Sequence, residues 1–237
     1  MDNVASLLEP VVLPVRIVAT VVVVLAIPLF LITSGVRGVA LEPVFYMDEF
    51  AKYRVSLTTG LPNEELQRVA LEFTNYFRSE PKRLDVTVNT STGPQPLFND
   101  REIQHMLDVQ SLFHQIFWVW GMSLAGLIIG AIAIIAVEPA TGGRAVVRAA
   151  AIGGGVTALL IGLLGLASLL DFSRLFYQFH LVSFSNDLWL LDPRRDRLIQ
   201  LFPQGFFFDA AIRIAVQTLV MGLVICGGSL VTLRTMR

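Results

Sequence analysis

Four long apolar stretches dominate the sequence, separated by two long polar intervals and one short one. The stretches cover residues 17–36, 116–137, 149–170 and 207–231, and they hold few charged side chains. A helix needs roughly 20 mostly apolar residues to cross the hydrocarbon core of a bilayer. The pattern therefore predicts an all-α polytopic membrane protein with four transmembrane helices.

The first long interval, residues 37–115, carries the periodicities of a small folded module. Aromatic and charged residues between 44 and 55 predict a helix that is broken by Gly60 and the proline after it. In residues 63–77 the apolar side chains recur at the spacing of one helical face. Residues 83–89 alternate apolar and polar, which predicts a strand, and the TSTGPQP that follows predicts a loop. We expect an α(+β) module outside the membrane.

A helix start signal lies at the end of this module. Asn99 and Glu102 have the spacing of a capping box, in which each side chain bonds the backbone N–H of the other residue. No proline or glycine follows before Gly121. One uninterrupted helix is therefore expected to run from the module into the second membrane segment.

The second long interval mixes aromatic and charged residues. It is too aromatic for a solvent loop and too charged to span a bilayer, and such a composition suits the membrane interface. We expect an aromatic-rich outer loop that packs on the module. We expect five divisions: the first segment with its membrane helix (1–36), the module (37–115), two membrane helices (116–170), the outer loop (171–206), and the last membrane helix with its tail (207–237).

Composition narrows the class of protein further. The 237 residues are 54% hydrophobic and only 16% charged, which excludes an ordinary soluble protein. A net charge of −1 and the lack of a basic tract leave nucleic acid nothing to bind. The single cysteine, Cys226, excludes a disulfide within the chain. The first apolar stretch is longer than the core of a signal peptide, so we expect it to remain as an anchor.

Arginines mark one side of the membrane. Arg16 precedes the first stretch, Arg144 and Arg148 lie in the short connection, and Arg234 and Arg237 end the chain. Short loops rich in positive charge stay in the cytoplasm. Both termini are therefore expected inside the cell, and both long intervals outside.

Ionisable residues gather directly before the second membrane segment. Helical spacing places Arg101, His105 and Asp108 on one face, with Glu102 a turn before His105. A nearby carboxylate fixes the tautomer of an imidazole and stabilises its protonated form, as a general base requires. His105 is a candidate base oriented by Glu102 or Asp108, although a single histidine in such a place is more often structural.

A second histidine, His180, lies in the other long interval, near Asn186, Trp189 and Asp192. Since both intervals are expected on the outer side, the two histidines can converge at the membrane surface. Asp192 precedes a proline and is equally suited to capping a turn. The third histidine, His114, is closer to the lipid and is expected to be interfacial.

Motifs for metal binding and covalent catalysis are missing. The sequence has no HExxH, CxxC or GxSxG, so we expect no metal, no cofactor and no acyl-enzyme nucleophile. Two histidines and an acid could still form a metal site that follows none of these motifs.

The last apolar stretch contains polar residues on one stripe. Asp209, Arg213 and Gln217 follow one another at i, i+4 and i+8. Ionisable groups at membrane depth usually face a partner or a cavity. The stripe is expected either to line a lipid cavity or to contain a structural Asp209–Arg213 pair.

Two blocks of the sequence resemble a known family. REIQHMLDV and FHLVSFSNDLWLLDPRRDRLIQLFPQGFF are similar to segments of the bacterial lipoprotein intramolecular transacylases called Lit and of related four-helix membrane proteins. VFYMDEFAKYRV resembles that group as well. The resemblance covers most of the chain in order and spacing.

The resemblance implies an activity at the outer face of the bacterial cytoplasmic membrane. The sn-2 acyl chain of a diacylated lipoprotein would move to the amine of its own N-terminal cysteine. His105, in the REIxHM block, and His180, in the FHxxxF block, are implied as active-site residues. We expect one to move the proton and the other to hold the oxyanion; His105 is our first choice for the proton. Arg101, Asn186 and Trp189 are candidates for positioning the lipoprotein among membrane lipids.

The residues alone also fit two other classes of protein. A non-catalytic membrane protein could bind a lipid or a partner through its outer module, and it would keep working without His105. A metal-dependent membrane hydrolase would lose its activity to a chelator.

Overall fold

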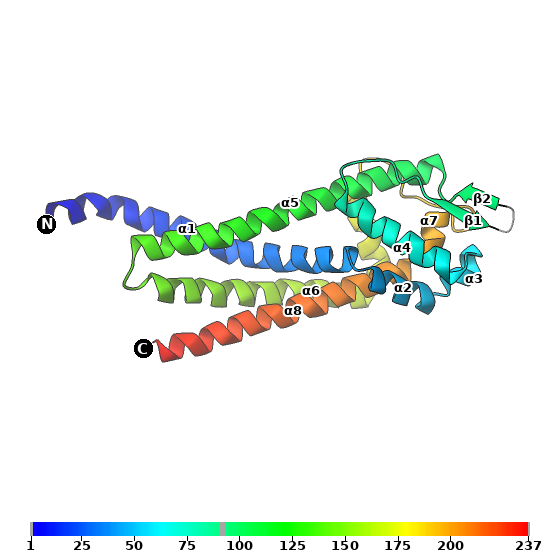
Figure 1. The fold of residues 1–237 in the computed structure, drawn as a ribbon. Coiled ribbons are helices and arrows are strands. Elements are labelled where there is room, and N and C mark those ends of the chain that lie inside the picture. Colours follow the sequence, from blue (N-terminus) through cyan, green and yellow to red (C-terminus); the bar gives the residue numbers. More distant parts are fainter. Residues whose placement is uncertain (1, 91–92, 237) are drawn as a thin grey trace. The chain divides into compact units, whose positions relative to one another are not determined.

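The computed structural model describes residues 2–90 and 93–236, which form two compact units (Figure 1). The bundle unit is built from Met1–Gly35, Phe117–Leu164 and Ile214–Arg237. The mixed unit is built from Val36–Ile116 and Gly165–Arg213. Four long helices contribute residues to both units.

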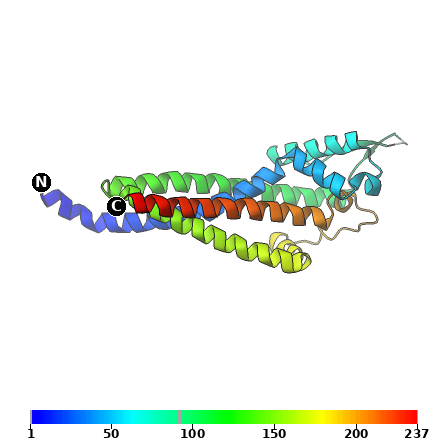
Figure 2. The ribbon, with the colours of Figure 1, turned by 90° about the horizontal axis from the view of Figure 1, so that it is seen from below.

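These four helices are long and apolar enough to cross a membrane, which confirms the predicted class of polytopic membrane protein. Their paths can be followed in Figures 1 and 2. The second of them is continuous from the module into the apolar segment, as the sequence predicted. Their bounds are α1 Asp2–Ala40, α5 Asp100–Val137, α6 Gly142–Ser183 and α8 Gln204–Thr235.

Close helix packing holds the bundle unit together. A Cβ atom at Gly154 of α6 would lie 2.7 Å from the backbone nitrogen of Cys226 in α8. One at Gly130 of α5 would lie 2.7 Å from the Val23 side chain of α1. Glycine at these positions lets the helix backbones approach closely.

In its described residues, the mixed unit contains four short helices and one hairpin besides the ends of the long helices. The helices are α2 Pro43–Lys52, α3 Val55–Thr59, α4 Asn63–Arg78 and α7 Arg197–Leu201. The helix predicted up to Gly60 breaks earlier, because Arg54 adopts a left-handed conformation with φ 52° between α2 and α3. The helix predicted over residues 63–77 is confirmed as α4.

The hairpin only partly matches the sequence prediction. Strand β1 (Thr87–Thr90) pairs antiparallel with β2 (Gly93–Pro96). The predicted alternation over 83–89 is confirmed by burial of Leu84, Val86 and Val88. The prediction of a loop was wrong at 93–96, where two prolines are tolerated because a two-stranded ladder consists of edge strands only.

Aromatic rings form the core of the mixed unit. Phe73 of α4 lies 4.7 Å from Phe202, measured between ring centroids, and Phe45 of α2 lies 5.3 Å from Phe206. Phe50 contacts both Phe202 and Phe206. These contacts confirm that the aromatic interval after α6 packs on the module.

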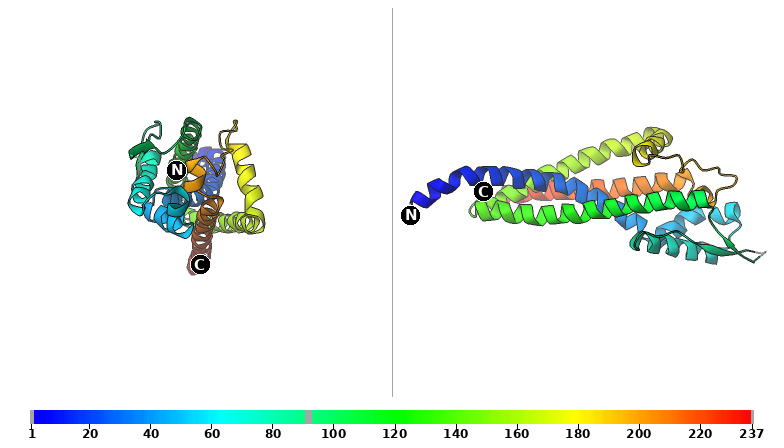
Figure 3. Two further views of the ribbon diagram at one scale, coloured as in Figure 1. Left: turned by 90° about the vertical axis from the view of Figure 1, so that its right-hand side faces the viewer. Right: turned by 90° about the horizontal axis from the view of Figure 1, so that it is seen from above.

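Helix α6 changes direction at Asp171, as the yellow part of the ribbon shows in Figure 3. Asp171 has non-helical angles of φ −156° and ψ 80°. Its carboxylate accepts a hydrogen bond of 3.0 Å from the backbone N–H of Arg174. Asp171 therefore acts as the N-cap of a new helical segment, 172–183, within the interval where the sequence predicted a loop.

Candidate active site

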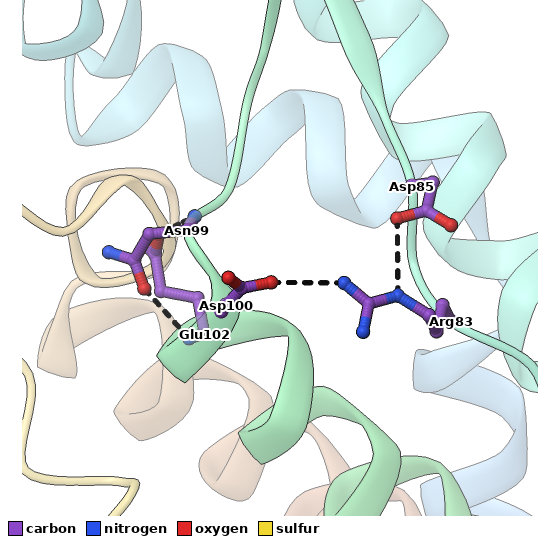
Figure 4. A network of polar contacts seen from close by, with 5 residues as sticks. All are labelled: Arg83, Asp85, Asn99, Asp100 and Glu102. Carbon is purple, nitrogen blue, oxygen red and sulfur yellow. Dashed lines mark hydrogen bonds and ion pairs between the residues drawn. The ribbon is translucent and has the colours of Figure 1, made fainter.

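The start of α5 is fixed by the predicted capping box (Figure 4). The backbone N–H of Glu102 donates to the Asn99 side chain at 3.0 Å, and the backbone N–H of Asn99 donates to the Glu102 carboxylate at 2.8 Å. Beside the box, Arg83 forms ion pairs with Asp100 at 3.1 Å and with Asp85 at 3.7 Å. The first turn of the histidine-bearing helix is thus held in place.

Glu102 also ties α5 to α7. Its second carboxylate oxygen accepts a hydrogen bond of 2.6 Å from the backbone N–H of Leu198, and the residue is only 1% exposed. Both oxygens therefore bind backbone groups, whereas the sequence suggested that Glu102 orients His105. In the structure this carboxylate supports the fold around the site.

His105 is buried and faces aromatic rings. It is 6% exposed, and its ring centroid lies 5.1 Å from that of Phe184 and 6.4 Å from that of His180. Among the described residues, Nδ1 of His105 has no hydrogen-bond partner. Asp108, the other acid expected to orient it, instead accepts a hydrogen bond from Asn186. No side chain therefore fixes the tautomer of His105 through this nitrogen.

His180 is buried too, but one of its nitrogens is bound. Nδ1 lies 2.7 Å from the backbone oxygen of Phe176. A carbonyl oxygen can only accept, so Nδ1 carries the proton in this contact. In the neutral ring Nε2 then has a lone pair, as a proton acceptor requires. Distances alone thus give His180 a defined tautomer.

Aromatic side chains enclose the His180 imidazole. Trp189 lies 4.8 Å from it, Phe176 4.4 Å and Phe179 5.3 Å, measured between ring centroids. Trp189 is a residue the sequence singled out. Phe176 and Phe184 were missed, although 176, 180 and 184 have the i, i+4, i+8 spacing of one helical face.

The segment after α6 is tied to α5 by polar side chains. Asn186 donates a hydrogen bond of 2.9 Å to Asp108, and Arg101 donates to the backbone oxygen of Asp187. The indole N–H of Trp189 donates to the backbone oxygen of Asn186 at 2.9 Å. The predicted supporting residues are therefore brought together, where they hold the Trp189 ring against His180.

Asp192 lies in a turn of the same segment. Its carboxylate accepts a hydrogen bond of 2.9 Å from the backbone N–H of Arg194 and forms an ion pair with Arg195. The turn-capping role that its position before proline suggested is confirmed. His114 is half-buried on α5. In the described part of the chain, no three histidine, cysteine or acidic residues are placed to hold a metal ion.

The polar stripe of α8 has other partners than predicted. Asp209 accepts a hydrogen bond of 2.6 Å from Tyr53 and forms an ion pair with Lys52, while Arg213 pairs with Glu42 at 2.6 Å. The Asp209–Arg213 pair was therefore the wrong prediction. Gln217 is exposed and belongs to the bundle unit.

Glu49 of α2 lies beside this cluster. Burial raises the pKa of its carboxyl to about 7, helped by a hydrogen bond to Asp209. Glu49 is thus poised to hold a proton near neutral pH.

Solved structures share this fold. An in meso structure of the membrane integral lipoprotein intramolecular transacylase Lit from Bacillus cereus matches with a TM-score of 0.68 and 21% identity, covering 93% of this chain and 96% of that one. A variant of the same protein with one histidine replaced by arginine matches with a TM-score of 0.71 and 20% identity, over 94% and 93% of the two chains. An alanine variant gives a TM-score of 0.70 at 20% identity, over 94% and 96%.

The sequence itself was compared with curated proteins and with models of protein families. No curated protein matches the chain. The family model described as lipoprotein intramolecular transacylase Lit matches residues 21–207, which is more than half of the chain. The chain therefore belongs to the Lit family, whose members are acyltransferases that act on lipoproteins in the membrane.

Proposed function

We propose that this protein moves the sn-2 acyl chain of a diacylglyceryl-cysteine lipoprotein to the lipoprotein's N-terminal amine, with His105 and His180 as the catalytic residues. The observation that carries the proposal is the pair of buried imidazoles with ring centroids 6.4 Å apart and aromatic rings around them. The site is proposed to face the outside of the bacterial cytoplasmic membrane, with both termini in the cytoplasm.

The reaction needs few groups because amine and ester belong to one substrate molecule. The amine nitrogen attacks the sn-2 carbonyl carbon, and the sn-2 oxygen leaves as a hydroxyl. Holding the two groups in attack geometry supplies much of the barrier reduction. The protein must then accept a proton, return it to the leaving oxygen and stabilise the oxyanion.

The hydrogen bond of His180 supports its role as the base. Nε2 of His180 takes the proton from the amine, and the bond from Nδ1 to the Phe176 carbonyl stabilises the resulting imidazolium. The same ring returns the proton to the sn-2 oxygen. His105, with no partner at Nδ1 among the described residues, donates an N–H to the oxyanion. This exchanges the roles that the sequence alone suggested as first choice.

Three further residues are proposed to position the substrate. Trp189 offers the face of its ring beside His180, and Asn186 and Arg101 hold the segment that carries this ring. Asp209 and Arg213 are bound to other side chains. We therefore assign them to the stability of the mixed unit in place of a lipid cavity.

Mass spectrometry on a synthetic diacylglyceryl-cysteine lipopeptide with a free amine tests the proposal. The purified protein should leave the mass unchanged and move one acyl chain to nitrogen, which fragmentation reveals. His180→Ala should lower the rate by roughly 10²- to 10⁴-fold, the usual contribution of acid-base catalysis. His105→Ala should lower it by roughly 10²- to 10³-fold, the usual cost of losing one donor to the oxyanion. His114→Ala is the matched control and should keep the rate.

Each alternative class gives a different result. Release of fatty acid by the wild type, stopped by a chelator, would identify a metal-dependent hydrolase. Full binding of the lipopeptide without any product, in the wild type and in both histidine variants, would identify a binding protein.

A further inference from the structure

Phe184 is an aromatic residue whose ring packs against both imidazoles. Its ring centroid lies 5.1 Å from that of His105 and 5.7 Å from that of His180. The ring stands edge-on to His105, with 74° between the two planes. Phe184 is 8% exposed, and its backbone N–H donates to the backbone oxygen of His180 at 2.9 Å. The ring is therefore fixed one turn beyond one histidine and against the other.

The chemistry of the site creates a need for such a ring. A base that can take a proton from an amine can also take one from water, and water can attack the same ester carbonyl. Hydrolysis would then release the acyl chain that should be transferred. Acyl-transfer sites avoid this side reaction by excluding water.

The two imidazoles of His105 and His180 with the aromatic rings packed on them, here called the histidine pocket, are suited to exclude water. His105 and His180 are 6% and 9% exposed, and phenylalanine rings pack against both imidazoles. Nδ1 of His105 is buried with no hydrogen-bond partner in residues 2–90 and 93–236. Removing the Phe184 ring would leave room for at least one water molecule beside the His105 imidazole.

We propose that Phe184 determines whether the acyl chain goes to the amine or to water, so that the protein carries a latent lipoprotein-ester hydrolase activity that this ring suppresses. The proposal rests on the proposed transacylase function. In the suppressed reaction, water attacks the sn-2 carbonyl carbon and gives a proton to a histidine. The ester C–O bond breaks, the sn-2 oxygen takes up that proton, and a fatty acid and a lyso lipopeptide with a free amine are released.

Variants of graded size test the proposal on the same lipopeptide in water labelled with heavy oxygen. Phe184→Leu and Phe184→Ala should raise the ratio of labelled fatty acid to N-acylated product by about tenfold or more over the wild type, with Ala above Leu. Leu190→Ala is the matched control, because Leu190 lies on the same segment and is half exposed. Its product ratio should equal that of the wild type.

Three outcomes would overturn the inference. The first is an unchanged product ratio in both Phe184 variants at any total rate. The second is loss of both products in both variants, since the ring would then be needed for the reaction as a whole. The third is an equal rise in Leu190→Ala. A wild type that makes no N-acylated product would instead refute the proposed function itself.

Discussion

The histidine pocket and the ion-pair cluster at the start of α8 both gather ionisable groups, but the fold satisfies them differently. In the cluster, Asp209 binds Lys52 and Tyr53, and Arg213 binds Glu42. In the pocket, the two imidazoles are surrounded by aromatic rings, and neither is bonded to a carboxylate among the described residues. The acids near the pocket bind backbone groups and Asn186 instead.

Under the proposed function, this difference separates ionisable groups that stabilise structure from those that take part in the reaction. A matched pair stabilises local structure and has little capacity left for a substrate. An imidazole held by one carbonyl, or by no hydrogen bond at Nδ1, keeps nitrogen atoms available for proton transfer. Unmatched polar groups in a buried pocket are therefore better markers of the reaction than the number of charges in a segment.

The largest loss of stability should follow from replacing Glu102, whose carboxylate binds backbone groups near the pocket and neither histidine. Glu102→Ala leaves the N–H groups of Asn99 and Leu198 without their acceptor. We expect about 3 kcal/mol or more of lost stability, because hydrogen bonds to buried charged groups are strong. Thermal unfolding in detergent measures it, with the exposed Glu64→Ala as control. A stable Glu102→Ala protein without activity would instead give Glu102 a direct role in the reaction.

The next effect concerns the bond that holds the Trp189 segment to α5. Asn186→Asp should lower kcat about tenfold with little change in KM, because the new carboxylate repels Asp108 and displaces the segment. Adding Asp108→Asn reverses donor and acceptor and should restore most of the rate. Rates that fall further in the double variant would contradict the positioning role and indicate separate contacts with substrate.

A smaller effect is expected in the ion-pair cluster. Arg213→Ala breaks the pair with Glu42, in which both side chains are more than a third exposed. Such pairs contribute about 1 kcal/mol or less. We expect a slightly lower Tm and an unchanged rate of acyl transfer. A loss of activity larger than the loss of folded protein would show that the ion-pair cluster also takes part in the reaction.

The ion-pair cluster should also give a pH dependence of stability. Burial and the hydrogen bond to Asp209 raise the pKa of Glu49 to about 7, with Asp48 adding to the rise and Lys52 opposing it. The protonated form is thus favoured in the folded state, and its stabilisation is lost as the pH rises through about 7. Tm should fall by a few degrees between about pH 6 and pH 8. Glu49→Gln should flatten this profile, and an equally steep profile in that variant would assign the effect to another group.

Patterns of apolar and polar residues close together in the sequence predicted the fold well. The four membrane helices, α4 and the capping box of α5 each rest on residues close in the chain, so local spacing contains the information. The hairpin was half missed because Pro94 and Pro96 argue for a loop by propensity, and only pairing with β1 makes them a strand. The cap at Asp171 could have been predicted from local sequence, but it was missed because Asp171 directly follows the apolar stretch 149–170.

The sequence singled out the two histidines, which lie near each other in the structure, but it did not reveal their hydrogen bonds. The tautomer of His180 depends on the Phe176 carbonyl, a backbone group that no side-chain pattern reveals. Glu102 looked like the partner of His105, yet it binds Leu198, whose position almost a hundred residues away is set by tertiary structure. The Asp209–Arg213 spacing suggested a pair, but Lys52 of α2 and the residues that flank α2 bind both side chains instead.

The N-cap at Asp171 sets where the helical turns that lead to His180 begin. Because residues 172–183 start from this cap, the turns between Asp171 and His180 are counted from it and not from the beginning of α6. A residue inserted before the cap leaves that count unchanged, whereas one inserted after it turns the imidazole by about 100° around the helix axis. The apolar length of α6 before Asp171 can therefore change without changing which face of the 172–183 segment carries His180.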